Sequence, residues 1–215
     1  MQANSDPISA LLLIGPGCPH CASLMDVLAK MVKQGDVAKL EIANVAVLPE
    51  TARNLGVRSV PWLRLGHIEF EGAHSEGEIK QWLQRMQSTE GMSVYFKQLL
   101  SQGKLDKVIE MVAANADYLH ALVLLASDPE TDMKVQLGVA AVIEDLQGND
   151  VLSEIVDDLG KMATSANAKI RADAVHFLSL TPTSNALPYL QTLATDDNEE
   201  VREIAAEALA EISVK

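Results

Sequence analysis

The chain has 215 residues, of which 48% are hydrophobic and 22% are charged, a composition typical of a folded protein large enough for two domains. Because 17 Lys and Arg stand against 30 Asp and Glu, the formal net charge is −13, which repels phosphate backbones and anionic lipid. We therefore expect neither nucleic acid nor a membrane as a partner. The longest apolar run near the start covers only residues 8–14, much shorter than the ~18 residues that span a bilayer. These observations favour a cytoplasmic location, with the periplasm after removal of a signal peptide as the alternative.

Residues 8–87 alternate short apolar runs with helical patterns. In chain order the pattern predicts a strand at 10–14, a helix from 21, a strand at 40–47, a short helix at 49–55, and strands at 62–65 and 68–70. Ser75 followed three residues later by Glu78 has the spacing of a capping box and predicts the start of a last helix. The predicted order β-α-β-α-β-β-α indicates a small α/β domain over residues 8–87.

From residue 88 onward the pattern predicts only helices. The predicted helices cover residues 92–101, 104–114, 117–127, 133–147, 151–164, 168–180, 186–195 and 199–213. Three stretches that begin at Lys134, Lys169 and Glu200 resemble one another, with starts 35 and 31 residues apart. A self-similar helix that follows another short helix is typical of an α-solenoid. Residues 128–213 resemble HEAT repeats, so we expect an all-α HEAT-like repeat domain over residues 88–215.

The acidic charge is concentrated in the predicted helical domain. Residues 88–215 carry 9 basic and 21 acidic side chains, whereas residues 1–87 carry 8 and 9. We interpret the acidic run at residues 196–200 as negative charge placed at the start of a helix, where the helix dipole favours it. The repeats are expected to bind a protein partner.

The chain contains only two cysteines, Cys18 and Cys21, and both lie in one Cys-Pro-His-Cys sequence. The sequence places them where a strand runs into a helix, with the first sulfur at the helix N-terminus and the second one turn later, within reach of a disulfide. The free N–H groups of the helix end stabilise a thiolate at Cys18, and His20 adds a donor or a positive charge. Pro19 suits the first turn of a helix because it lacks an N–H. We expect Cys18 to be the nucleophile and Cys21 the resolving thiol.

Other interpretations of the cysteine pair remain open at this point. The pair could form a structural disulfide or be two inert thiols. Zinc could be held by Cys18, Cys21 and two of the three histidines His20, His67 and His74, although the second ligand pair lacks a compact spacing. Covalent haem attachment is excluded because Ala22, not histidine, follows the second cysteine. We expect no metal.

The predicted strand, the Cys-Pro-His-Cys sequence, the helix and the later Ser59-Val60-Pro61-Trp62 sequence together resemble the thioredoxin superfamily. The resemblance covers residues 8–87 and implies that Pro61 follows a cis peptide bond and faces the cysteine pair. It also implies that the backbone of Val60 pairs with a bound substrate. Gly17 and Leu12 stand where typical thioredoxins have a tryptophan and a buried acid. The expected fold class is an α/β thioredoxin-like N-terminal domain followed by an all-α HEAT-like helical repeat domain.

The residues and the resemblance lead to one functional hypothesis and two alternatives. The hypothesis is a thiol–disulfide oxidoreductase that exchanges a dithiol and a disulfide at Cys18 and Cys21 with protein thiols or disulfides, while the repeats dock the partner. It needs no cofactor besides the redox-active disulfide itself. The alternatives are a non-catalytic interaction scaffold and a glutathione- or iron–sulfur-linked carrier that shares one cluster between two chains. The sequence leaves the redox direction open.

Overall fold

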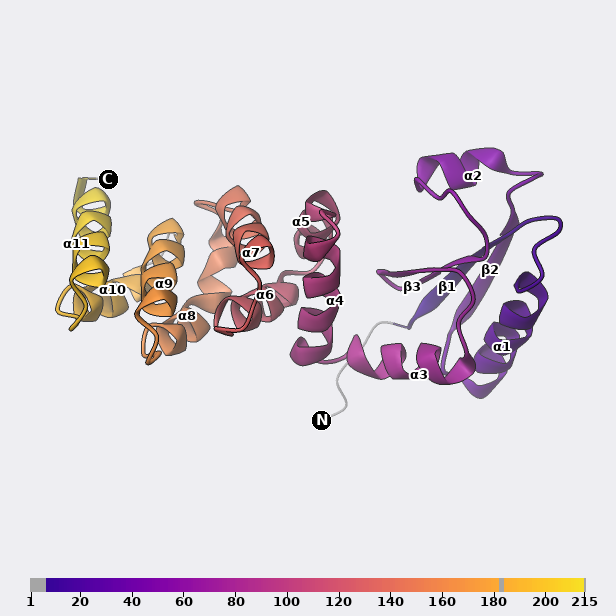
Figure 1. Ribbon diagram of the computed structural model, residues 1–215, viewed down its shortest axis with the longest axis horizontal. Coiled ribbons are helices and arrows are strands. Elements are labelled where there is room, and N and C mark those ends of the chain that lie inside the picture. Colours follow the sequence, from indigo (N-terminus) through magenta and orange to yellow (C-terminus); the bar gives the residue numbers. More distant parts are fainter. Residues whose placement is uncertain (1–6, 182–183, 215) are drawn as a thin grey trace. The chain divides into compact units, whose positions relative to one another are not determined.

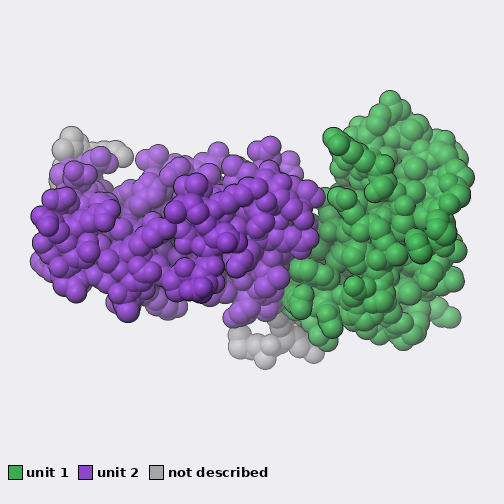
Figure 2. Space-filling view, viewed as in Figure 1, with its two compact units in different colours: residues 1–87 green, residues 88–215 purple. Residues whose placement is uncertain are grey.

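The computed structural model describes residues 7–181 and 184–214. The chain divides into two compact units, residues 1–87 and residues 88–215, coloured separately in Figure 2. Residues 182, 183 and 215, which belong to the predicted repeat domain, lie outside the described residues.

The first unit is built around one mixed sheet with the strand order β2-β1-β3-β4. Strands β1 (Ser9–Ile14) and β2 (Lys39–Asn44) run parallel, and β3 (Trp62–Leu65) and β4 (Ile68–Glu71) follow in antiparallel order. Helices α1 (Cys21–Gln34) and α3 (Glu76–Arg85) lie on one side of the sheet, and α2 (Pro49–Asn54) lies on the other (Figure 1). The predicted order of elements is confirmed.

The sheet is buried on both faces, as the alternation of side chains along β1 shows. Leu12 and Leu13 are adjacent, so they point to opposite faces, and both are fully buried. On the α2 side, Leu13 packs with Ala43 and Trp62, against partly buried residues that include Leu55. Because β1 and β2 run parallel and β3 starts opposite the end of β1, the loops after β1, after β2 and before β3 all lie along one edge of the sheet.

Two local structures in this unit, the capping box of α3 and the proline start of α2, are present as the sequence predicts, whereas strand β2 is shorter than predicted. Ser75 Oγ accepts the backbone N–H of Glu78, and the Glu78 carboxylate accepts the N–H of Ser75 at 2.7 Å, so the capping box starts α3. Pro49 is in the first turn of α2. The strand predicted over residues 40–47 ends at Asn44, where the chain turns. The side-chain oxygen of Asn44 accepts the N–H of Ala46, and its backbone carbonyl accepts the N–H groups of Val47 and Leu48.

The second unit is a stack of paired helices, drawn from magenta to yellow in Figure 1. Its helices are α4 (Thr89–Ser101), α5 (Leu105–Ala114), α6 (Leu119–Ala126), α7 (Met133–Asp145), α8 (Val156–Met162), α9 (Ala168–Leu180), α10 (Leu187–Leu193) and α11 (Glu199–Val214). Helix α4 starts three residues earlier than predicted because the Ser88 hydroxyl accepts the N–H of Gly91 and caps it. None of the helices in the described part of the chain is long and apolar enough to cross a bilayer.

Three helices that the sequence predicts as continuous begin with a separate 3₁₀ turn. The segments η1 (Ala116–Tyr118), η2 (Asp150–Ile155) and η3 (Ser184–Ala186) precede α6, α8 and α10. At the first two, the side chain of Asn115 or Asn149 accepts an N–H only two residues further on. This short hydrogen bond tightens the first turn, which apolar spacing alone does not reveal.

Arg171 joins successive repeats in the second unit. Its guanidinium donates to both carboxylate oxygens of Asp196, at 2.8 and 2.6 Å, and to Asp197 at 2.6 Å. The side chains of Arg171 and Asp196 are only 11% and 9% exposed. The hydrogen bonds from Arg171 hold the pKa of Asp196 well below its usual range. The acidic run therefore does more than start a helix: Asp196 receives Arg171, while Asn198 accepts the N–H of Val201 at the start of α11.

Replacing Arg171 by alanine should destabilise the second unit, because Asp196, whose side chain is only 9% exposed, would lose the partner that neutralises its charge. The measurement is urea unfolding of the full chain followed by circular dichroism. Since the pair lowers the pKa of Asp196 in the folded state, its stabilisation is complete at neutral pH and is lost as the solution is acidified. Acidification should therefore lower the free energy of unfolding of the wild type by more than it lowers that of the Arg171→Ala variant.

Arg53→Ala is the control, because Arg53 and Glu50 form an ion pair with side chains 73% and 60% exposed. Its removal should change stability by less than about 1 kcal/mol. Equal unfolding midpoints for the two variants would show that the Arg171 pair contributes nothing to the repeats.

Candidate functional site

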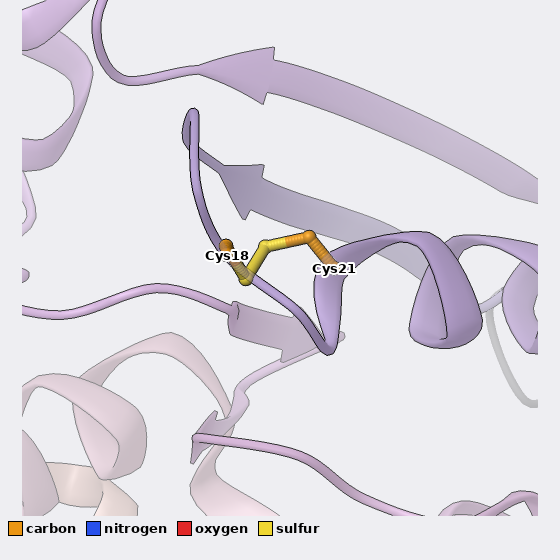
Figure 3. The surroundings of a disulfide bond; sticks show 2 residues. All are labelled: Cys18 and Cys21. Carbon is orange, nitrogen blue, oxygen red and sulfur yellow. A yellow bond between two sulfur atoms is a disulfide. The ribbon is translucent and has the colours of Figure 1, made fainter.

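The two cysteines form a disulfide at the point where the loop after β1 enters α1. Figure 3 shows the bond bridging the loop and the first turn of the helix. The sulfur atoms are 2.08 Å apart and the Cα atoms are 5.6 Å apart. The sequence prediction that both sulfurs lie within bonding reach at a strand-to-helix turn is confirmed.

The two sulfur-bearing residues differ in exposure. Cys21 is the first residue of α1 and only 6% exposed, whereas Cys18 is partly exposed in the loop. A partner sulfur therefore has access to Cys18 and not to Cys21. This asymmetry is what attack at Cys18 and resolution by Cys21 require.

The start of α1 leaves its positive end open towards the disulfide. The first turn contains no acidic residue, and His20, the N-cap residue, makes no side-chain capping hydrogen bond. The first N–H groups of a helix have no partner within the helix, and their partial positive charge favours an anion. Pro19 and His20 are both exposed. Pro19 lies before the first turn of α1 and not in it, because the helix starts at Cys21. The role of His20 stays a prediction.

The loop before β3 contains the expected cis peptide bond, between Val60 and Pro61. Pro61 is buried, and its carbonyl accepts the N–H of Gly72 at 2.9 Å, which joins the start of β3 to the loop after β4. Val60 is half-buried and packs against the cluster around Trp62. Both predicted substrate-binding residues thus lie on the same sheet edge as the cysteine loop.

Gly15 connects the cysteine loop to the cis-proline loop. A Cβ atom at Gly15 would lie 3.3 Å from Cγ2 of Val60 and 3.4 Å from Cγ2 of Val45. The carbonyl of Gly15 faces the N–H of Cys18 at 3.4 Å. The backbone just before the disulfide therefore lies directly against Val60. Sequence reasoning did not single out Gly15, although a glycine between a buried strand and a functional turn indicates a close approach.

The interior of the first unit is apolar. Leu12, at the position where typical thioredoxins have a buried acid, is fully buried. Among the described residues 7–87 no polar or charged side chain is buried. Exposed apolar residues follow β2 at the same sheet edge, with Val47 73% and Leu48 48% exposed. The sequence analysis did not predict this exposure.

The histidines considered as zinc ligands have other surroundings. The Nε2 atom of His74 is 3.2 Å from the carbonyl of Glu71, and its ring contacts the edge of Phe70. His67 is exposed in the turn between β3 and β4. Over the residues that the structure describes, no group of three or more His, Cys, Asp or Glu side chains is placed to hold a metal ion.

Comparison with known families agrees with this geometry. Residues 10–84 match the family model of a thioredoxin domain, and residues 119–210 match that of HEAT repeats. The chain therefore contains a thioredoxin-like domain followed by HEAT-like repeats, as both resemblances in the sequence predict. The HEAT match starts at residue 119 and not at 128, because α6 is the first helix of the pair that α7 completes. No curated protein matches the chain.

Replacing Gly15 by valine should destabilise the first unit by about 1–3 kcal/mol, because the added methyl groups need space that Val60 and Val45 already fill. If the unit still folds, the two loops should be pushed apart and thiol exchange at Cys18 should slow. Thermal unfolding and the rate of reaction with a disulfide reagent measure the two effects.

The matched control is Gly77→Ala in α3, where a Cβ atom has no neighbour closer than Ser75 Oγ at 4.0 Å. It should stabilise the helix by about 0.5–1 kcal/mol and leave exchange unchanged. A Gly15→Val protein as stable and as reactive as the wild type would refute the importance of this close approach.

Proposed function

We propose that this protein is a thiol–disulfide oxidoreductase that acts on protein thiols or disulfides through Cys18 and Cys21, with the helical repeats as a docking surface for its partners. The observation that carries the proposal is the unequal exposure of the two bonded cysteines, one accessible at the positive end of a helix and the other buried. A purely structural disulfide does not need this arrangement.

The proposed exchange from the oxidised chain proceeds in two steps. A thiolate of the partner attacks Sγ of Cys18, the Cys18–Cys21 bond breaks, and Cys21 leaves as a thiolate. A second partner thiolate then attacks the partner sulfur of the mixed disulfide, and Cys18 leaves as a thiolate. The partner loses two electrons and becomes a disulfide, while the chain gains two electrons and becomes a dithiol. The reduced chain runs the same steps in reverse on a partner disulfide.

The surroundings of the site support a polypeptide partner. Val60 and Pro61 lie just before β3, at the same end of the sheet as the cysteine loop. There the backbone of Val60 would pair with an extended segment of the partner. The exposed side chains of Val47 and Leu48 lie along the same edge and would contact apolar residues of that segment. Because residues 7–87 contain no buried acid, Cys21 would exchange its proton with water.

The two cysteines should respond differently to substitution. Cys18→Ser should reduce the rate of insulin reduction with dithiothreitol to the rate without protein, because no accessible nucleophile remains. Cys21→Ser should retain attack by Cys18 but lose resolution, so that partners accumulate as mixed disulfides. A non-reducing gel followed by mass spectrometry measures the trapped species.

The double variant with serine at both positions is the control for non-specific trapping. Insulin reduction by Cys18→Ser at the wild-type rate would refute the proposal and favour the non-catalytic scaffold. Equal trapping by Cys18→Ser and Cys21→Ser would contradict the assignment of the two roles.

The thiol of Cys18 in the reduced protein should be alkylated by iodoacetamide well below pH 8, because the open start of α1 stabilises its thiolate. The rate of alkylation should titrate between about pH 3.5 and 7.5, whereas an ordinary cysteine titrates near 8.5. His20→Ala in the same assay tests whether the imidazole contributes to this shift. Titration of the wild-type thiol near pH 8.5 would count against an activated nucleophile.

A further inference from the structure

Arg58 is an exposed cation in the loop before β3, and the proposed exchange chemistry does not use it. It lies two residues before Val60. Val57 and Val60 both pack against the buried cluster that contains Trp62, whereas the two residues between them are exposed. The two valines therefore hold the backbone of this loop in place and leave the side chain of Arg58 in solvent.

The register of the sheet places Arg58 close to the cysteine loop. The antiparallel alignment of β1 and β3, continued two positions beyond its last pair, brings Gly15 opposite Val60, and a Cβ atom at Gly15 would lie 3.3 Å from Cγ2 of Val60. The N–H of Cys18 faces the carbonyl of Gly15 at 3.4 Å. Arg58 is at most ~7 Å along the chain from Val60. Its guanidinium can therefore reach a polypeptide that is bonded to Cys18 and lies along Val60.

The loops at this end of the sheet contain no Lys, Arg, Asp or Glu besides Arg58. These loops cover residues 15–20, 45–48, 55–61 and 72–75. Two acidic residues flank them: Glu50 of α2, which accepts a hydrogen bond from Arg53 at 3.1 Å, and Glu71 at the end of β4. Among the described residues, neither of them nor any other acid forms an ion pair with Arg58. Its guanidinium is therefore available to a partner.

The net charge of the chain does not cancel the effect of Arg58 on a partner. Although the formal net charge is −13, residues 1–87 carry 8 basic and 9 acidic side chains, so the first unit is close to neutral. The Debye length at physiological ionic strength is ~8 Å, and exposed charges further apart than this are largely screened. A segment that lies along Val60 is within about this distance of Arg58, so it experiences the positive charge of this side chain.

We propose that Arg58 selects partners that carry an acidic side chain close to the reacting cysteine. The guanidinium donates to the carboxylate of an Asp or Glu in the segment that pairs with Val60, and its planar fork can donate two parallel hydrogen bonds. The inference rests on the proposed oxidoreductase function and names its substrate class. The substrates are polypeptides with an acidic residue within about three positions of the exchanging cysteine, which is ~10 Å of extended chain.

The test uses the reduced full chain, in a single turnover, on symmetric disulfides of the blocked peptides AEACAEA, AQACAQA and AKACAKA. The thiolate of Cys18 attacks one peptide sulfur and the other peptide leaves as a thiolate. The thiolate of Cys21 then attacks Cys18 and releases the first peptide, so the chain becomes the disulfide and the substrate becomes two thiols. Chromatography of acid-quenched samples gives the rate. Each rate is divided by the rate with dithiothreitol, because the charges also change the reactivity of the peptide disulfide.

The glutamate peptide should react about threefold faster than the glutamine peptide, and the lysine peptide should be the slowest, as expected for one exposed ion pair. Arg58→Gln should remove this preference and Arg58→Glu should reverse it. Lys33→Glu is the matched control, because Lys33 is exposed in the last turn of α1, at the opposite end of this helix from Cys21. This variant should keep the order of the wild type. Rising salt should reduce the preference.

Equal relative rates for the three peptides would overturn the inference and leave the oxidoreductase proposal standing. The wild-type order in Arg58→Glu would also overturn it. So would equal effects of Arg58→Glu and Lys33→Glu, because the preference would then follow the net charge of the chain and not the position of Arg58. Reaction with none of the three peptides would refute the oxidoreductase proposal and this inference with it.

Discussion

The candidate site depends on one close approach between the backbone at Gly15 and the side chain of Val60. The turn that leaves β1 passes close to Val60 because Gly15 has no side chain, and the loop with the cis peptide bond lies at the same end of the sheet as the loop with Cys18. The contact is possible because β1 and β3 are adjacent antiparallel strands, so the end of one lies at the start of the other. A side chain at Gly15 would push the two loops apart. It would then change the surface beside Cys18 where we propose that a partner binds.

The same arrangement explains why the two sulfurs are not equivalent. Cys21 belongs to the buried face of α1, with Leu24 and Leu28 following on the same stripe, whereas Cys18 precedes the helix in an exposed turn. The packing of α1 against the sheet therefore shields one thiol and leaves the other accessible. Among residues 7–87 no acid is buried, and the first turn of α1 has no acidic side chain that would offset the partial positive charge of the helix start.

Charge has a different purpose in the repeats. Part of the acidity is used internally, as in Asp196 and Asp197, which bind Arg171 and join successive helix pairs. Other acidic side chains are exposed at helix starts, as Glu90 is in the first turn of α4. The acidic side chains of this unit therefore differ in their burial and in whether a cationic partner is bonded to them.

Much of this protein follows from the sequence by itself. The apolar periodicities, the proline and glycine positions and the Ser75–Glu78 spacing determine the order of elements in the first unit, because these signals are local. The repeated helices from residue 134 onward predict the solenoid for the same reason. The single Cys-Pro-His-Cys sequence at a strand-to-helix turn determines that the two sulfurs can bond.

Only the tertiary structure decided which groups distant in the sequence meet. The contact of Gly15 with Val60 and the bond between Arg171 and Asp196 join residues separated by at least 25 positions. No periodicity encodes such pairs, because they depend on how strands are ordered and how helices stack. For the same reason the sequence indicates only helix-starting charge in the acidic run at residues 196–200, whereas Arg171 reaches Asp196 because α9 and α11 pack together.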